Sequence, residues 1–142
     1  MSTSLGACLA RVTKPARIGD KLSQVDTPAI VVRLDALKKN LNSMKDYVQM
    51  QSTELSRQIL LRPHAKTHKC PAIAKMQVDL YGAVGICCQK LDEAEAMIYF
   101  GVTDIFLTNE VVGEKKISRL CELARTGSFN SLFIVDVLLH IS

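Results

Sequence analysis

The chain has 142 residues, of which 48% are hydrophobic and 23% are charged, which is ordinary globular composition and enough for one domain with a sizeable core. The net charge of +4 comes mostly from residues 1–25, and only 5% of residues are aromatic, so we expect no nucleic-acid partner. No apolar run reaches the roughly eighteen residues of a membrane-spanning helix, so we expect no membrane partner either.

Residues 1–25 are predicted to form a flexible basic tail. The first seventeen residues lack acidic side chains, as transit peptides do, but the stretch is short and Pro15 interrupts any amphipathic helix. The five cysteines are an odd number without a C-x-x-C pair, which indicates reduced thiols. We therefore expect a cytoplasmic location, with an organelle matrix as the weaker alternative.

After the tail, short apolar segments typical of strands alternate with segments of helical period. The predicted strands are 30–34, 60–66, 84–88, 104–108 and 132–137. A first helix follows Asp35, with an apolar stripe at Leu37, Leu41, Met44 and Val48, and the polar stretch 49–57 is predicted to connect it to the next strand. Pro71 is predicted to open a second helix, and Leu91 to lie on the inner face of a third helix that stops at Gly101. A fourth helix, around Leu120, is predicted to end near Gly127.

This order of elements predicts an α/β fold. Repeated strand–helix units give parallel strands joined by right-handed helical crossovers, and near-continuous apolar strands suggest that both sheet faces are covered. The pattern by itself fits a doubly wound sheet and a (β/α)8 barrel equally well.

A basic cluster at the end of the second predicted strand is the main candidate site. If residues 60–66 are extended, Arg62, His64 and Lys66 share one face, and three cations converge at one strand end. Crowded like charges and partial burial disfavour protonation of an amine, so Lys66 is a candidate nucleophile toward a carbonyl. An anionic ligand would relieve the remaining repulsion.

The segment Arg62-Pro-His-Ala-Lys-Thr-His-Lys69 closely resembles the cofactor-lysine segment of D-threonine aldolases and eukaryotic-type D-serine dehydratases, which are alanine-racemase-like pyridoxal phosphate enzymes. Several further motifs agree in order, and the resemblance spans roughly residues 18–136. These motifs are Val25–Val32, Leu34–Leu37, Gly82–Glu95 and Asn109–Gly113.

The resemblance implies a site and a fold. It implies that Lys66 forms the Schiff base with pyridoxal phosphate, and we expect His64 to be a neutral, hydrogen-bonded neighbour of the cofactor and Asn109 to line the pocket. It also selects the barrel, of which residues 26–142 would supply roughly the N-terminal half as a partial alanine-racemase-like domain. The implied reaction is lysis of a small D-hydroxy amino acid, either cleavage or dehydration.

Family members are more than twice this long, so the chain is interpreted as a truncated product. The resemblance implies a divalent metal, zinc or manganese, in full-length relatives, with ligands expected outside this chain; we predict no metal site within it. A non-catalytic fragment that binds pyridoxal phosphate without turnover is the alternative function. Half a barrel leaves open strand edges, so self-association into a homo-oligomer is expected.

Other polar residues near the cluster have structural interpretations. Arg62 is interpreted as an ion-pair partner, with compensation of cofactor charge as the alternative. A metal-binding pair of His64 and His68 is not favoured, since no third ligand is evident nearby. Cysteines 87 and 88 are expected to be packing residues, and the acidic residues 92, 93 and 95 to interact with a helix dipole rather than to take part in catalysis.

Overall fold

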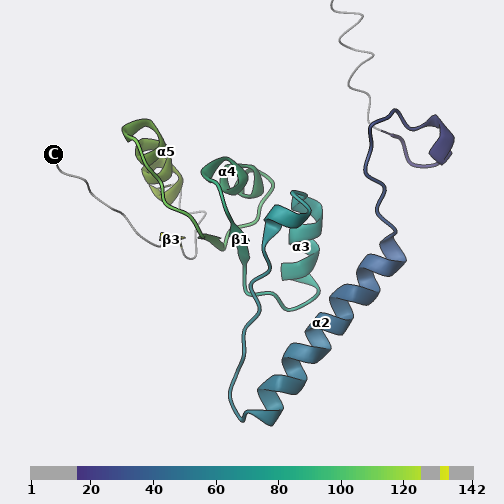
Figure 1. The fold of residues 1–142 in the computed structure, drawn as a ribbon, viewed down its shortest axis with the longest axis horizontal. Coiled ribbons are helices and arrows are strands. Elements are labelled where there is room, and N and C mark those ends of the chain that lie inside the picture. The colour runs from purple at the N-terminus through teal and green to yellow at the C-terminus, as the bar shows by residue number, and fades with distance from the viewer. Residues whose placement is uncertain (1–15, 126–131, 135–142) are drawn as a thin grey trace, which may run out of the picture. The chain divides into compact units, whose positions relative to one another are not determined.

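The computed structural model describes residues 16–125 and 132–134 (Figure 1). The chain divides into two compact units, Met1–Leu34 and Asp35–Ser142. The first contains the 3-10 helix Leu22–Gln24, and the predicted domain boundary after residue 25 stays a prediction. The elements that follow are α2 (Leu34–Glu54), the 3-10 helix Ala65–Thr67, α3 (Pro71–Asp79), β1 (Ile86–Cys88), α4 (Leu91–Tyr99), β2 (Ile105–Leu107), α5 (Glu114–Arg125) and β3 (Leu132–Ile134).

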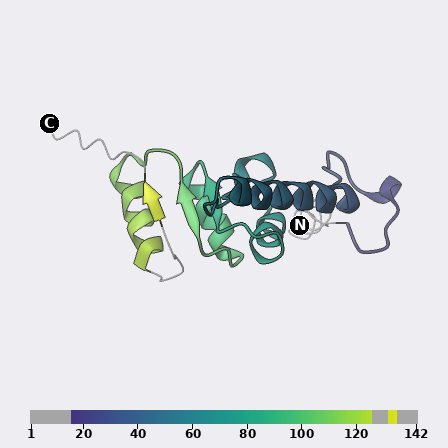
Figure 2. The same cartoon turned by 90° about the horizontal axis from the view of Figure 1, so that it is seen from below.

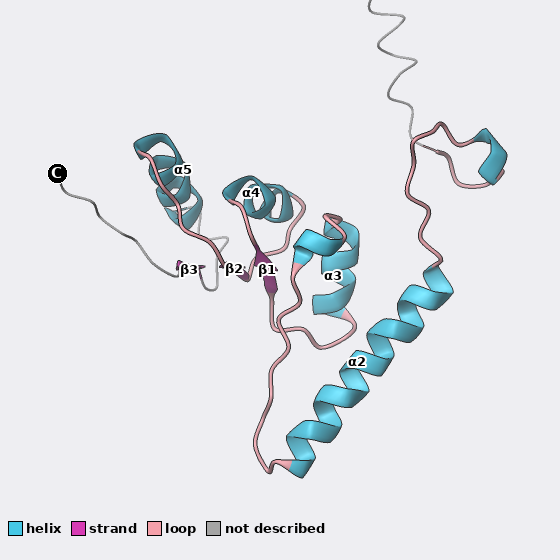
Figure 3. Ribbon diagram, in the orientation of Figure 1, coloured by secondary structure: helices cyan, strands magenta, loops and turns pink. Residues whose placement is uncertain are grey.

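The three strands form a parallel sheet in the order β1-β2-β3. Ile86 is the register partner of Ile105, and Ile105 that of Leu132, so β2 and β3 lie side by side (Figure 2). Helices α3, α4 and α5 follow one another along one side of the strands, and α4 contacts both β1 and β2 (Figure 3). This confirms an α/β fold with parallel strands and helical crossovers, whereas a closed barrel is not shown by the described residues.

The core lies between the sheet and the helices. The first and last residues of β1 and β2 are fully buried, and they cluster with Ala94 and Met97 of α4. These strand residues are Ile86, Cys88, Ile105 and Leu107. Burial of each large aliphatic side chain contributes about 1.5–3 kcal/mol.

The opposite face of the sheet carries Cys87 and Phe106, which are only half-buried. The prediction that both faces are covered is therefore wrong for β1 and β2 as described. Because crossovers of one hand place their helices on one side of a sheet, these helices bury a single face.

Two expectations near α2 were wrong. Residues 30–33 form no strand, because a strand needs a neighbour that supplies hydrogen bonds, and β-branched composition does not provide one. The helix also continues to Glu54, through much of the predicted connection. Ser52 and Thr53 are accommodated there because their hydroxyls donate to the carbonyls one turn earlier, at 2.8 and 3.1 Å.

The predicted strand 60–66 is reduced to a single parallel bridge between His64 and Cys87. Hydrogen bonds flank it, from the Val84 N–H to the Leu61 carbonyl at 3.0 Å and from the Cys87 N–H to the Pro63 carbonyl at 2.7 Å. The chain then turns into the 3-10 helix Ala65–Thr67, which takes Lys66 out of strand alternation. We call residues 61–64 the edge segment.

The other predicted elements are present with shifted ends. The strands predicted at 84–88 and 104–108 are confirmed as β1 and β2, each shorter than expected. Of the last predicted strand, 132–134 is confirmed as β3, and 135–137 lie outside the described residues, as does the helix end near Gly127.

Candidate functional site

The site is built where parallel chain segments end. The edge segment, β1 and β2 run in the same direction and end at His64, Cys88 and Leu107. Residues that directly follow them therefore lie at the same edge of the sheet, which is where α/β folds commonly place ligands. Lys66 and Thr108 are two of these residues.

His64 is hydrogen-bonded at both ring nitrogens. Its Nδ1 accepts the backbone N–H of Lys66 at 3.1 Å, and its Nε2 lies 3.3 Å from the hydroxyl of Thr108. The Thr108 hydroxyl in turn donates to the Cys88 carbonyl at 3.2 Å. His64 is thus hydrogen-bonded within the protein, and its place beside a cofactor stays a prediction. Thr108 was missed because nothing in its local sequence singles it out.

Lys66 has an exposed side chain within the 3-10 helix, next to the buried Ala65, so the expected partial burial of its amine was wrong. The short helix is held by the His68 N–H, which donates to the Ala65 carbonyl at 3.2 Å. Burial of Ala65 anchors the turn against the core while the adjacent amine remains accessible to a ligand.

Arg62 does not join His64 and Lys66 in a cluster of cations. Its guanidinium donates to the Asp104 carboxylate at 2.7 Å, directly before β2 and therefore toward the opposite end of the sheet from Thr108. Because this carboxylate balances its charge, the expected convergence of three cations was wrong. The ion-pair interpretation of Arg62 is confirmed.

Asn109 lines a cavity of about 250 Å³ between the ends of β1 and β2 and the starts of the helices after them. Gln89, Leu91 and Lys116 also line it, whereas Lys66 and His64 are not among its described lining residues. The structure therefore places Asn109 in a neighbouring hollow. Its contact with a cofactor stays a prediction.

The two cysteines of β1 are poor nucleophiles. Burial, together with smaller contributions from the nearby Glu93 and Cys87, raises the pKa of Cys88 to about 12. Burial also raises the pKa of Cys87, although Arg62 acts in the other direction, and its thiol donates to the Arg62 carbonyl at 3.5 Å. Both thiols are protonated at neutral pH, in agreement with a packing role.

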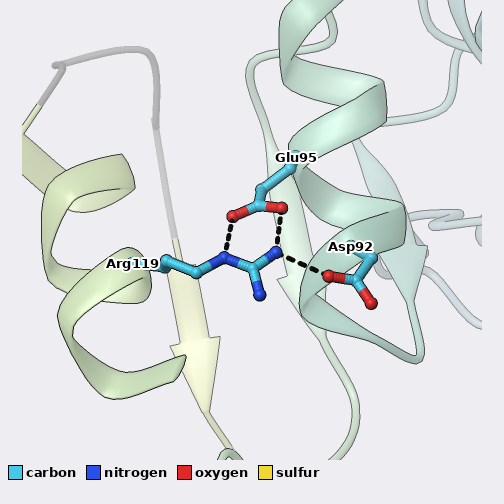
Figure 4. A network of polar contacts seen from close by, with 3 residues as sticks. All are labelled: Asp92, Glu95 and Arg119. Atoms are coloured by element: carbon cyan, nitrogen blue, oxygen red, sulfur yellow. Dashed lines mark hydrogen bonds and ion pairs between the residues drawn. The ribbon is translucent and has the colours of Figure 1, made fainter. Parts of the chain in front are cut away.

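Three acidic residues of α4 have structural partners. Glu93 accepts the Gln89 N–H at 2.9 Å; burial raises its pKa, but hydrogen bonds from backbone N–H groups and from Lys69 outweigh this and lower it. Asp92 and Glu95 both bind Arg119 of α5 (Figure 4). Arg119 lowers the pKa of Asp92, and the two carboxylates raise that of Arg119. This network joins α4 to α5 through Asp92, Glu95 and Arg119.

His68 is engaged at Nδ1, which accepts the Cys70 N–H at 3.0 Å. Burial lowers its pKa, while the Gln77 side chain and the Cys70 backbone partly offset the effect.

Within residues 16–125 and 132–134, no group of three or more histidine, cysteine or acidic side chains is arranged to hold a metal ion. Of the helices in the described part of the chain, none combines the length and apolar character needed to cross a membrane.

No family model matches this chain, but known proteins are similar to it over most of its length. A D-threonine aldolase of Arthrobacter sp is 44% identical over 116 residues, which is 82% of this chain and 29% of the relative. A 3-hydroxy-D-aspartate aldolase of Paracoccus denitrificans is 39% identical over 87% of this chain and 30% of the relative. A D-threo-3-hydroxyaspartate dehydratase of Delftia sp. is 32% identical over 83% of this chain and 29% of the relative.

The fold agrees with these sequences. The crystal structure of D-threonine aldolase from Filomicrobium marinum superposes with a TM-score of 0.69 at 48% identity, covering 79% of this chain and 28% of that one. The chain thus spans about 30% of the length of the curated relatives that it matches. The resemblance drawn from the octapeptide is confirmed, and the chain is a homologue of D-threonine aldolases, 3-hydroxy-D-aspartate aldolases and the related hydroxyaspartate dehydratase.

Proposed function

We propose that this chain is the cofactor-lysine part of a pyridoxal-phosphate-dependent lyase, with Lys66 as the residue that binds the cofactor covalently. The observation that carries the proposal is the position of Lys66: an exposed amine two residues after the edge segment, at the sheet edge where β1 and β2 also end. The octapeptide around Lys66 resembles the cofactor-lysine segment of the family, which supports the same residue.

The groups present suit the aldehyde end of pyridoxal phosphate. A primary amine condenses with an aldehyde, and an imidazole that accepts a hydrogen bond at Nδ1 adds no positive charge beside it. The buried Ala65 holds the turn, which limits where the Lys66 amine can reach. When bound, the cofactor supplies an electron sink for bond cleavage at the α-carbon of an amino acid.

The substrate class follows from what the relatives' names share. D-threonine, 3-hydroxy-D-aspartate and D-threo-3-hydroxyaspartate are all α-amino acids with a hydroxyl on the adjacent carbon. We propose a D-3-hydroxy amino acid as substrate. Cleavage of the bond between the α- and β-carbons gives glycine and an aldehyde. Elimination of water followed by hydrolysis of the resulting enamine gives a 2-oxo acid and ammonia, so the products distinguish an aldolase from a dehydratase. For the full-length relatives, we propose that activity also requires zinc or manganese.

The test is a titration of the purified chain with pyridoxal phosphate. We expect a change in the visible absorbance of the cofactor, and borohydride should make its link to the protein permanent. Peptide mapping should then find the cofactor mass on the peptide that contains Lys66. Lys66→Arg keeps the charge but cannot link to the aldehyde, and Lys69→Arg is the matched control three residues away.

Loss of labelling in Lys66→Arg with full labelling in Lys69→Arg supports the proposal. Equal labelling of both variants, or none in the wild type, refutes the assignment of Lys66. D-threonine with zinc or manganese is then added to a separate sample that has not been treated with borohydride. Release of aldehyde or 2-oxo acid identifies the lyase, whereas cofactor binding without product identifies the alternative of binding without turnover.

A further inference from the structure

The ring of His64 is held from two distant parts of the chain. Nδ1 accepts the N–H of Lys66, two residues on, and Nε2 lies 3.3 Å from the Thr108 hydroxyl, 44 residues away. His64 itself is bridged to Cys87 through the backbone. The imidazole therefore connects the turn that carries Lys66 to the end of β2.

Only one assignment of donors and acceptors fits all of these hydrogen bonds. A nitrogen that accepts a backbone N–H has no proton, so the proton of the neutral ring is on Nε2. The Thr108 hydroxyl uses its only proton on the Cys88 carbonyl at 3.2 Å, which leaves its oxygen to accept from Nε2. The Thr108 N–H also donates to that carbonyl, at 2.9 Å, and so fixes the residue that carries the hydroxyl.

We infer that Thr108 is a positioning residue for the cofactor lysine, which it affects through His64. This inference rests on the proposed function of Lys66. By accepting the Nε2 proton, Thr108 keeps the Nδ1 lone pair directed at the backbone of Lys66 and the ring uncharged beside the amine. Thr108 would thus fix both the tautomer of His64 and the turn that carries Lys66. Hydrogen-bond partners of metal-binding histidines fix ring tautomer and orientation in the same way.

Three variants separate this role from general packing. Thr108→Val has nearly the same shape but lacks the hydroxyl, and Thr108→Ser restores it. Thr103→Val makes the same chemical change at an exposed threonine just before β2 and is the matched control. Each is compared with the wild type by circular dichroism, by titration with pyridoxal phosphate and by proton–nitrogen correlation spectra of isotope-labelled histidine, with the His64 signal assigned from its absence in His64→Asn.

We expect the His64 spectrum of the wild type to show a protonated Nε2 and an unprotonated Nδ1. Thr108→Val should give a mixture of tautomers and weaken cofactor binding on the order of tenfold, as expected for one lost hydrogen bond. Thr108→Ser and Thr103→Val should match the wild type.

A wild-type His64 with its proton on Nδ1 would overturn the inference even if Thr108→Val fails to fold. So would an unchanged tautomer and unchanged binding in a folded Thr108→Val. If no form of the chain binds pyridoxal phosphate, the proposed function fails, while the spectrum still decides whether Thr108 sets the tautomer of His64.

Discussion

Arg62 and Asp104, 42 residues apart in the chain, form an ion pair in which Nη1 lies 2.7 Å from Oδ1. The same nitrogen also donates to the Asp104 carbonyl at 3.2 Å. The pair joins the edge segment to the start of β2. Lys66 and Thr108 lie toward the opposite end of the sheet, where the strands end. Both side chains are about four-fifths buried, so the pair is less screened by solvent than a surface ion pair.

Arg62→Met should destabilise the chain by about 1–3 kcal/mol, because it leaves the Asp104 carboxylate without its guanidinium partner in a partly buried position. Urea unfolding measures the free energy. Lys75→Met removes a solvent-exposed pair with Asp79 and should cost no more than about 0.5 kcal/mol. Equal losses in the two variants would show that Arg62 has no special structural role.

Gly85→Ala should be more damaging than its small size suggests. A Cβ at this position would lie 2.1 Å from the Arg62 guanidinium and 2.5 Å from the Asp104 carbonyl oxygen, and the latter is backbone that cannot turn aside. We expect a loss of about 1–3 kcal/mol from overpacking. Gly113→Ala is the control: it meets no atom within 4 Å, although its φ of +96° carries its own strain of roughly 1 kcal/mol.

The thermal midpoint of Gly85→Ala should therefore fall below that of Gly113→Ala. The reverse order would mean that the edge segment moves away from β1 at little cost.

His68 should make stability depend on pH in a defined direction. Burial lowers its pKa from the ordinary value of 6.5, so below that pH the unfolded chain binds a proton that the folded chain excludes. The contribution is fully present above pH 6.5 and is lost as the pH falls toward the folded pKa. Urea unfolding of the wild type and His68→Asn between about pH 5.5 and 7.5 avoids the titration of carboxylates. The wild type should lose stability with acidification, and the variant should lose less.

Thiol reactivity should separate Cys121 from Cys88. Cys121 is exposed on α5, whereas Cys88 is fully buried with a pKa raised to about 12. Brief treatment with N-ethylmaleimide at mildly alkaline pH, followed by peptide mapping, should modify Cys121 and spare Cys88, and denaturant should make both react. Rapid modification of Cys88 in the folded chain would mean that β1 is not covered by α4.

Much of the fold was predictable from local patterns. The helices α3, α4 and α5 and the strands β1 and β2 each have their own periodicity and their own start and stop residues, such as Pro71 and Gly101. The octapeptide likewise indicated the group of homologues without any knowledge of packing, and the role of Lys66 stays a proposal. The helical state of residues 49–54 was missed because serine and threonine there satisfy their hydroxyls within the helix, which composition alone does not reveal.

What the tertiary structure decided depends on contacts between residues far apart in the chain. Whether residues 30–33 and 60–66 are strands depends on which partner supplies their hydrogen bonds, and only the bridge from His64 to Cys87 forms. The pairing of Arg62 with Asp104 and of His64 with Thr108 follows from strand register, which a residue's own neighbours do not determine. The amino acids therefore specified most of the helices and short strands and pointed to Lys66 as a candidate, whereas packing decided which distant residues pair with one another.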